Sequence, residues 1–420
     1  MKYPAFSLVK QHFTTTPIDD VAAAVRTELH NLRLSDRIFP GHTVAITVGS
    51  RGIANIKIVL STLVEELKGI GAKPFLVPSM GSHGGATADG QVKLLAGYGI
   101  TEENIGAPVI SDMAVIELGR SELGLPVYLD KMAYSAEHII VMNRVKPHTD
   151  FEAPVESGII KMMTIGLGKQ KGAEQYHNAV LEHGYYKILM AHARIIMKKA
   201  PVTMGIGLVE NQLDQTQIIK AVWAEDIEET EVALQQISKT LLPRIPFKEI
   251  DLLIVDEMGK DISGTCMDQN VIARTVIRVG TAPREPKIRR IFVRDLTEKS
   301  QGMATGIGNA DFTTTRLVSK IDRNATYINC LSACEPEMAA IPPYYDSDRE
   351  ILDQALKTIG LIEPEEARVV HIRNTLDLSY MWISEALLAE ARTVKALEIL
   401  SDTQPLQLSG EGNIIAKWPA

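Results

Sequence analysis

The sequence predicts an α/β fold with two α/β domains whose sheets are largely parallel. Three observations predict it. Short apolar runs alternate with amphipathic helical patterns, polar or glycine-rich loops follow several of those runs, and one proline-containing stretch divides the chain. The chain has 420 residues and is 45% hydrophobic, which gives enough apolar surface for two or three packed domains.

The first half of the chain repeats a strand, loop and helix pattern. Apolar residues recur at helical spacing over residues 18–32, and the apolar run 42–48 predicts a buried strand. Because parallel strands end at the same edge of a sheet, we expect the side chains that follow them to meet there. The elements that continue the pattern are a helix over 56–67, a strand over 74–78, a helix over 88–96, a strand over 137–143, a helix over 178–199, strands over 202–210 and 217–223, and a helix over 227–242.

The segment around Pro243 and Pro246 is the best linker in the sequence, because two prolines and a charge cluster separate a finished helix from a new strand. We therefore expect an N-terminal domain over residues 1–247 and a C-terminal domain over 248–420, with the active site in a cleft between them. The second half predicts strands over 250–255, 291–293, 326–330 and 367–372, a helix over 311–320, and a helix plus a strand within 268–279.

Composition excludes several classes of protein. The net charge is −8 and the cations are scattered among acids, so nucleic acid is not an expected partner. No signal peptide and no run of about 18 apolar residues is evident, so we expect a cytoplasmic protein with no membrane partner. Only Cys266, Cys330 and Cys334 are present, which excludes a disulfide framework, and the strand-like residues before Cys330 favour burial over a metal site.

Two histidines follow predicted strands and are candidates for acid–base chemistry. His83 lies in GSHGG, where glycines leave the imidazole unshielded, and His148 lies in KPHTD, where Pro147 fixes the chain. Histidine is the side chain whose proton moves near neutral pH. The alternatives are a turn or helix-capping histidine at 83 and a surface turn at 148.

The segment 142–178 is dense in glycine and turn residues and is interpreted as a site loop. Lys161 lies in its apolar part, ESGIIKMMTIGLG, where burial should lower the pKa of the amine and make it nucleophilic. The alternative is a lysine whose stem packs while its ammonium reaches solvent. Lys169 and Lys171, in GLGKQKG, are candidates for phosphate or carboxylate contacts, although the glycine spacing does not match a dinucleotide-binding motif.

His177 is a candidate metal ligand or a structural histidine. The sequence has no HExxH, CxxC or paired-carboxylate signature, so side chains alone supply too few ligands for a metal. Arg51, in VGSRG, could bind a carboxylate or phosphate in fork geometry. In the second half, SGTCMDQNVIAR offers three further candidates for ligand contacts, with solvated loops as the alternative: Asp268, Asn270 and Arg274.

Taken in order, five motifs resemble the nickel-dependent lactate racemase family and its wider group of 2-hydroxyacid racemases and epimerases. They are GSRG (49–52), GSHGG (81–85), KPH (146–148), SGIIKMMTIGLGK (157–169) and QYH (175–177), with GKDISGTCMDQN as a looser match in the second half.

The resemblance implies a nickel pincer nucleotide, pyridinium-3,5-bisthiocarboxylate mononucleotide nickel, attached covalently to Lys161, with His177 as the protein ligand of the nickel. It implies that His83 and His148 are the catalytic acid–base pair, while hydride passes reversibly between the substrate and the cofactor. The expected cofactor contacts are Ser50, Arg51, Gly166, Gly168 and Lys169, and the expected substrate contacts are Arg51, Asp268, Asn270 and Arg274.

Some positions depart from the family pattern. Val48 stands where an acidic residue is common, and Ala273 and Val276 stand where a polar pair is expected. We therefore expect a 2-hydroxy acid other than lactate, one that is larger, dicarboxylic or sugar-derived, with enzymes of cofactor biosynthesis as partners. The alternatives are a metal-dependent hydrolase or lyase that uses His83 and His148, and a non-catalytic hydroxy-acid-binding protein.

Overall fold

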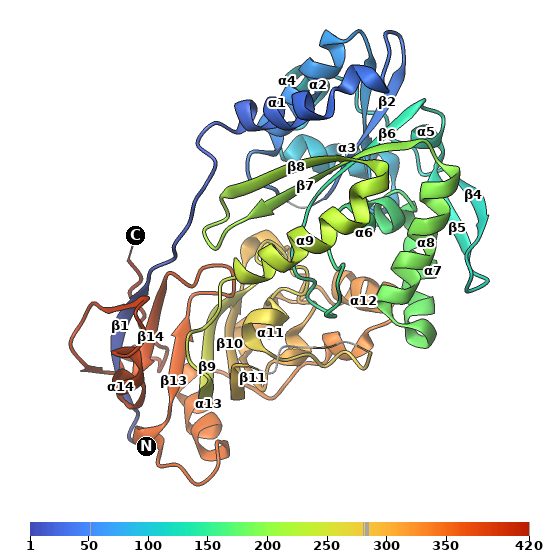
Figure 1. The fold of residues 1–420 in the computed structure, drawn as a ribbon. Coiled ribbons are helices and arrows are strands. Elements are labelled where there is room, and N and C mark those ends of the chain that lie inside the picture. The colour runs from blue at the N-terminus through green and yellow to red at the C-terminus, as the bar shows by residue number, and fades with distance from the viewer. Residues whose placement is uncertain (51, 280, 282–284, 420) are drawn as a thin grey trace. The chain divides into compact units, whose positions relative to one another are not determined.

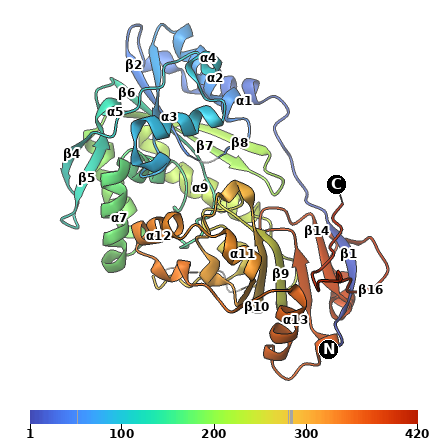
Figure 2. The same ribbon diagram turned by 180° about the vertical axis from the view of Figure 1, so that it is seen from behind.

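The computed structural model describes residues 1–50, 52–279, 281 and 285–419, and it contains two compact units (Figures 1 and 2). The site unit comprises Thr15–His148 and Glu152–Leu242, and the C-terminal unit comprises Met1–Thr14, Thr149–Phe151 and Pro243–Ala420. The predicted ranges 1–247 and 248–420 differ from this division at residues 1–14, 149–151 and 243–247. The difference at the N-terminus has a simple cause, because β1 (Ala5–Gln11) is a strand of the C-terminal unit's sheet.

The site unit is built on a five-stranded sheet in the order β3-β2-β6-β7-β8. All neighbours are parallel except β7 and β8, which pair antiparallel as a hairpin. The three strands at the β3 side are almost fully buried, as their continuous apolar runs predict. The bounds are β2 (Thr43–Val48), β3 (Lys73–Pro78), β6 (His138–Arg144), β7 (Val202–Glu210) and β8 (Thr216–Trp223).

Helices surround this sheet, and the predicted ones are found with small shifts. The first begins at Val21 and not at residue 18, because the carboxylate of Asp20 accepts a hydrogen bond from the Ala23 N–H (2.9 Å) and caps the helix there. The larger helices are α1 (Val21–Leu32), α2 (Ile56–Gly69), α3 (Ala88–Gly97), α7 (Lys169–His183), α8 (Tyr185–Lys199) and α9 (Ile227–Thr240). Short helices α4 (Glu102–Ile105) and α5 (Lys131–Tyr134) and a hairpin of β4 (Val115–Arg120) and β5 (Pro126–Asp130) complete the unit.

The segment 142–178 is only partly a loop, which corrects the interpretation from sequence. It contains α6 (Ile159–Lys161), a π-helical turn over Met162–Gly166 and the part of α7 that runs from Lys169 to residue 178. Glycine density concealed these helices, because several of the glycines serve close packing. The single helix predicted over 178–199 is instead α7 and α8, which Gly184 separates with a positive φ of 75°.

The C-terminal unit contains a nine-stranded sheet in the order β12-β11-β10-β9-β13-β14-β1-β15, with β16 paired to β1. The strands from β12 to β13 are parallel, and β14, β1, β15 and β16 are antiparallel. The bounds are β9 (Glu249–Met258), β10 (Lys287–Leu296), β11 (Phe312–Thr314), β12 (Tyr344–Tyr345), β13 (Val369–Ile372), β14 (Tyr380–Ser384), β15 (Leu397–Ile399) and β16 (Gln404–Pro405).

Two predictions for this unit were wrong and a third was wrong in part, because the helix predicted over 311–320 begins only at Thr315, after strand β11. Residues 326–330 lie in helix α12 (Arg323–Ser332), which the carboxylate of Asp322 caps by accepting from the Ala325 N–H (3.0 Å). Within 268–279, α10 (Gln269–Ile272) is present but no strand follows it. Cys330 is nevertheless buried, as expected, while Cys334 is half-buried. The remaining helices of eight or fewer residues are α11 (Thr315–Lys320), α13 (Asp348–Ala355) and α14 (Leu388–Ala391).

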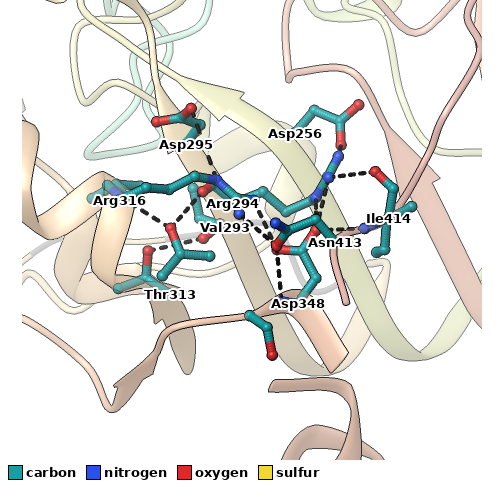
Figure 3. A network of polar contacts seen from close by, with 12 residues as sticks. Asp256, Val293, Arg294, Asp295, Thr313, Arg316, Asp348, Asn413 and Ile414 are labelled. Atoms are coloured by element: carbon teal, nitrogen blue, oxygen red, sulfur yellow. Dashed lines mark hydrogen bonds and ion pairs between the residues drawn. The ribbon is translucent and has the colours of Figure 1, made fainter. Parts of the chain in front are cut away.

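A buried polar network holds the C-terminal segment against this sheet (Figure 3). Arg294 of β10 forms ion pairs with Asp256 of β9 and with Asp348 (2.7 Å), and it donates to the Ile414 carbonyl (2.8 Å). Burial alone would raise the pKa of the Asp256 carboxyl, but His371 and Arg294 overcome it and hold that pKa below its ordinary value. In the described part of the chain, no helix has the length and apolar character needed to cross a membrane.

Candidate active site

The structure brings three of the predicted residues, His148, Lys161 and His177, into one cluster in the site unit. His148 follows the end of β6, Lys161 is the last residue of α6, and His177 lies on α7. The Nζ atom of Lys161 contacts Nε2 of His148 directly, and it lies 3.5 Å from the Ser157 hydroxyl. The charge of Lys161 also acts on His177.

The cluster keeps both imidazoles neutral. Burial, and then the charges of Lys161 and Lys146 and the neighbouring His177, lower the pKa of His148 well below its ordinary value. Burial, and then the charge of Lys161, lower the pKa of His177 to about 4. At neutral pH His148 can therefore accept a proton, and His177 can donate a lone pair to a metal.

His177 has a buried ring nitrogen that could serve as a ligand. Its Nδ1 atom is buried and has no hydrogen-bond partner within the described residues. A buried imidazole nitrogen normally finds a partner, because desolvation without one is costly. The ring packs edge-on against Tyr176 at a centroid distance of 5.6 Å. An orphaned nitrogen of this kind fits the nickel ligand that the family resemblance implies.

Protein side chains would not complete the coordination of such a metal. Across the residues that the structure describes, no group of three or more histidine, cysteine, aspartate or glutamate side chains is placed to hold a metal ion. A single neutral imidazole beside a reactive amine instead fits a metal whose other ligands belong to an attached organic group. The residues of the cluster therefore fit a metal that takes most of its ligands from outside the protein.

Glu156 fixes the backbone at His148. Its carboxylate accepts hydrogen bonds from the N–H groups of His148 (2.7 Å) and Ala153 (2.9 Å), and it forms an ion pair with Lys239 of α9 (2.7 Å). The Glu156 side chain is only 2% exposed, so these contacts are held in a region of low dielectric. The imidazole of His148 also lies near the Tyr185 ring, at a centroid distance of 6.2 Å.

His83 is held by a separate loop after β3. Gly84 and Gly85 follow it with φ values of 68° and 66°, a conformation that favours glycine. The Nδ1 atom of His83 contacts the Ser50 hydroxyl, on the loop after β2, and the Gln91 amide donates to the His83 carbonyl (3.3 Å). The strand order β3-β2-β6 places the loops of His83, Ser50 and His148 at one edge of the sheet.

The loop of His83 adjoins the segment that follows Lys161. The Gly81 N–H donates to the Gly166 carbonyl at 3.4 Å. A Cβ atom at Gly166 would lie 2.6 Å from the Met162 sulfur and 2.8 Å from the Ser79 carbonyl oxygen, and one at Gly168 would lie 2.6 Å from a backbone oxygen. Close packing therefore accounts for Gly166 and Gly168, and their expected contact with a cofactor stays a prediction.

Lys169 has a structural role in place of the cofactor contact expected from the sequence. It is fully buried, and its ammonium forms an ion pair with Asp130 (2.9 Å). The same ammonium donates to the Pro78 carbonyl (2.6 Å) and to the Gln91 side chain (3.3 Å). The ammonium thus ties β3, β5 and α3 together from inside the unit.

The predicted residues of the C-terminal unit serve its local structure. Asp268 caps α10 by accepting from the Asn270 N–H (2.9 Å), and the Asn270 side chain returns to the same carboxylate (3.1 Å). Arg274 pairs with Asp311 and donates to the Ile288 carbonyl (2.9 Å). Their contact with a substrate stays a prediction. Arg51, the remaining candidate for both cofactor and substrate, lies outside the described residues.

Sequence reasoning missed two carboxylates that support the cluster, Glu156 and Glu231. Glu231 lies on the apolar face of α9, between Ile227 and Leu234, and is completely buried. A lone acidic residue at a core position of an amphipathic helix is a readable signal, because a buried charge needs a partner. Glu156 carries no comparable signal, since it lies in an irregular segment.

Residues 8–187 match the family model of the lactate racemase N-terminal domain. Together with the fold, this match to part of the chain supports an assignment to the lactate racemase family. This match supports a racemase-type function in general. No curated protein matches the chain.

Two solved structures resemble the fold over most of the chain. A protein from Thermotoga maritima has 11% identity and a TM-score of 0.53, and the match covers 83% of this chain and 93% of that one. The lactate racemase apoprotein from Thermoanaerobacterium thermosaccharolyticum has 14% identity and a TM-score of 0.50, with 89% of this chain and 99% of that one covered. At such identities the likeness shows the fold alone, a mixed α/β architecture with mostly parallel sheets.

Proposed function

We propose that this chain is a racemase or epimerase of a 2-hydroxy acid and that it uses a nickel pincer nucleotide attached to Lys161. The observation that carries the proposal is the cluster itself. An amine contacts one neutral imidazole, His148, while a second imidazole, His177, has a buried nitrogen with no partner in the described part of the chain. When bound, the nucleotide supplies reversible hydride acceptance, which no amino-acid side chain supplies.

Each residue of the cluster has a separate task. Lys161 supplies the amine for covalent attachment, and its position at the end of α6 holds the attachment point near the sheet edge. His177 supplies the protein ligand of the nickel. His148 accepts the proton of the substrate hydroxyl, because its low pKa keeps the imidazole unprotonated at neutral pH. Glu156 keeps His148 in place through its backbone N–H.

His83 is the second acid–base residue of the proposal. The two enantiomers of a 2-hydroxy acid present the hydroxyl on different sides of C2, so one imidazole is needed on each side. His83 reaches the sheet edge from the loop after β3 and His148 from the loop after β6, with β2 between the two strands. The Ser50 hydroxyl contacts Nδ1 of His83 and orients the ring.

The substrate we propose is larger than lactate, or carries a second carboxylate or sugar hydroxyls. Support comes from Val48, Ala273 and Val276, which replace the polar residues of the family pattern. Arg274 is a poor partner for a second carboxylate, because Asp311 and backbone carbonyls already occupy its guanidinium. Arg51 is the better candidate. The proposed setting is the cytoplasm, where enzymes of cofactor biosynthesis would load the chain.

A turnover assay tests the proposal. The chain is co-expressed with cofactor biosynthesis enzymes and incubated with single enantiomers of 2-hydroxy acids, and chiral chromatography detects the opposite enantiomer or epimer. His148→Gln and His83→Gln should each lower kcat by roughly 10²- to 10⁴-fold while nickel content stays unchanged. His30→Gln, an exposed histidine on α1, is the matched control and should keep full activity.

The assay also separates the alternatives. Hydrolysis or elimination with a divalent metal and no nickel would favour a metal-dependent hydrolase or lyase. Binding of a hydroxy acid by the loaded chain without inversion at C2 would favour a binding protein. Either result contradicts the racemase proposal.

A further inference from the structure

Glu231 of α9 reaches the start of the helix that carries Lys161. Its Oε2 atom accepts a hydrogen bond from the Ile160 N–H at 2.7 Å, and the N–H of Ile159 also acts on the carboxyl. The first N–H groups of a helix have no partner inside it, and Gly158, the residue before α6, has no side chain to cap them. Glu231 therefore supplies from another helix the cap that the local sequence lacks.

The carboxyl fits closely against the chain at this point. A Cβ atom at Gly158 would lie 2.7 Å from Glu231 Cδ and 3.1 Å from Val145 Cγ2, so only glycine leaves room for the carboxyl. The φ of Gly158 is 176°, an extended conformation that any residue adopts. Space, and not backbone conformation, therefore explains the glycine.

Helix α9, which carries Glu231, is held in place by close packing. It packs on β7 (Figure 1). Cβ atoms at Gly205 and Gly207 of β7 would lie 2.8 Å from Ile227 Cγ1 and 2.5 Å from Leu234 Cδ1. The same helix carries Lys239, which holds Glu156 and through it the backbone of His148. One helix thus supports both partners of the contact between Lys161 and His148.

Glu231 caps the helix as a neutral carboxylic acid and does not form an ion pair within the described residues. Burial raises the pKa of its carboxyl to about 8, although the N–H groups of Ile160 and Ile159 lower it in part. At neutral pH the group is mostly protonated and accepts through Oε2 as a neutral acid.

We propose that Glu231 is a positioning residue for Lys161, one that caps α6 from α9 and so fixes where the amine leaves the helix. This inference goes beyond the proposed function. It rests on that proposal in one respect only, namely that the Lys161 amine is the point of cofactor attachment. The positional claim itself concerns the chain without any cofactor. Without the cap, α6 frays at its first turn, and the amine loses its fixed contact with His148.

Three variants of the full chain, prepared without cofactor, test the inference. Glu231→Leu removes the acceptor, Glu231→Gln keeps an acceptor of the same size, and Gln235→Leu is the control. Gln235 lies one turn further along α9 and is also buried, and neither side-chain amide atom has a hydrogen-bond partner in the described chain. Hydrogen exchange of the Ile160 amide reports the cap, and the rate of Lys161 acylation by an N-hydroxysuccinimide ester reports the amine.

In Glu231→Leu, exchange of the Ile160 amide should rise about five- to tenfold, as expected for the loss of one buried hydrogen bond. Acylation of Lys161 should rise at least about threefold, because the freed amine becomes accessible. Glu231→Gln should stay within about twofold of the wild type in both rates, and so should Gln235→Leu. If Glu231 only filled space, Glu231→Leu would behave like the wild type, because leucine has a side chain of similar size. Rescue by Glu231→Gln together with failure of Glu231→Leu therefore identifies the hydrogen bond as the cause.

Three results overturn the inference. Acylation of Lys161 could stay unchanged while Ile160 exchange rises, Glu231→Gln could behave like Glu231→Leu, or Gln235→Leu could produce the same changes. If Glu231→Leu does not fold, Gly158→Ala displaces the carboxyl sterically and should raise both rates; unchanged rates in that variant reject the inference. If the wild-type chain never accepts a cofactor, the proposed function is wrong. The rates of Ile160 exchange and Lys161 acylation would not change, because they are measured on the chain without cofactor.

Discussion

Replacing Lys161 by Met should raise the pKa of His148. The substitution keeps the length of the stem and removes the ammonium that contacts Nε2 of the imidazole. Since the positive charge of Lys161 disfavours a second positive charge on the ring, its removal favours protonation. Acylation of the same amine would remove the charge in the same way, so the variant also mimics an occupied attachment point.

The size of the effect follows from the contact. Two unit charges about 3 Å apart interact by roughly 5 kcal/mol at an effective dielectric constant of about 20. Both side chains are half-buried and not enclosed, so solvent screens much of this energy. With one pKa unit worth about 1.4 kcal/mol, a rise of about 1 to 2 units is expected. Burial is the larger cause of the low pKa, so the value should remain below that of a free histidine.

The assay is an NMR pH titration of the histidine Cε1–H signals in the chain without cofactor. His148→Gln assigns the signal, and Lys171→Met is the control, because Lys171 lies on the same segment with its ammonium over the Tyr128 ring. The signal of His177 should also move upward, by less, since Lys161 is the second cause of its low pKa. A pKa of His148 that changes by less than about 0.3, or that falls, refutes the coupling.

Further predictions concern stability. Lys169→Met leaves a buried carboxylate unpaired and should lower the free energy of unfolding by about 3 to 5 kcal/mol in urea titrations, whereas Arg194→Met, at an exposed ion pair, should cost less than about 1 kcal/mol. Arg294→Met should cost about 3 to 5 kcal/mol for the same reason, and a cost below 1 kcal/mol would show that the network in Figure 3 is not structural. Burial lowers the pKa of His192 to about 4, so the unfolded chain binds an additional proton between about pH 6.5 and 4, and stability falls as the pH falls through that window. His192→Phe should reduce this loss, which amounts to at most about 3 kcal/mol, and an unchanged pH dependence would contradict the assignment.

The sheet of the site unit was predictable because most of its strands are buried on both faces. Continuous apolar runs such as 43–48 and 202–210 predict buried strands. The glycine-rich or polar loops after them mark the carboxyl ends of these strands. The clustering of His148, Lys161 and His177 was predictable for a different reason. The motifs that carry them follow the family order, so the resemblance placed them together before any contact was known.

Other features depend on contacts that a linear pattern does not contain. β1 pairs with β14, whose paired residues lie 370 to 378 positions later in the chain, so nothing local assigns β1 to the C-terminal unit. Residues 326–330 have the β-branched and aromatic composition of a strand, but the cap at Asp322 starts a helix there. Lys169 looked like a phosphate contact because glycines flank it. Its partner Asp130 lies 39 residues earlier, so the buried ion pair could not be read from spacing.

The most direct measurement of the central claim is the intact mass of the chain together with its nickel content, after co-expression with cofactor biosynthesis enzymes. The wild type should carry one covalent mass increment of the nucleotide and about one nickel per chain. Lys161→Ala should lose the increment, and His177→Ala should keep the increment but lose nickel. An increment that persists in Lys161→Ala, or nickel that persists at full level in His177→Ala, would contradict the account.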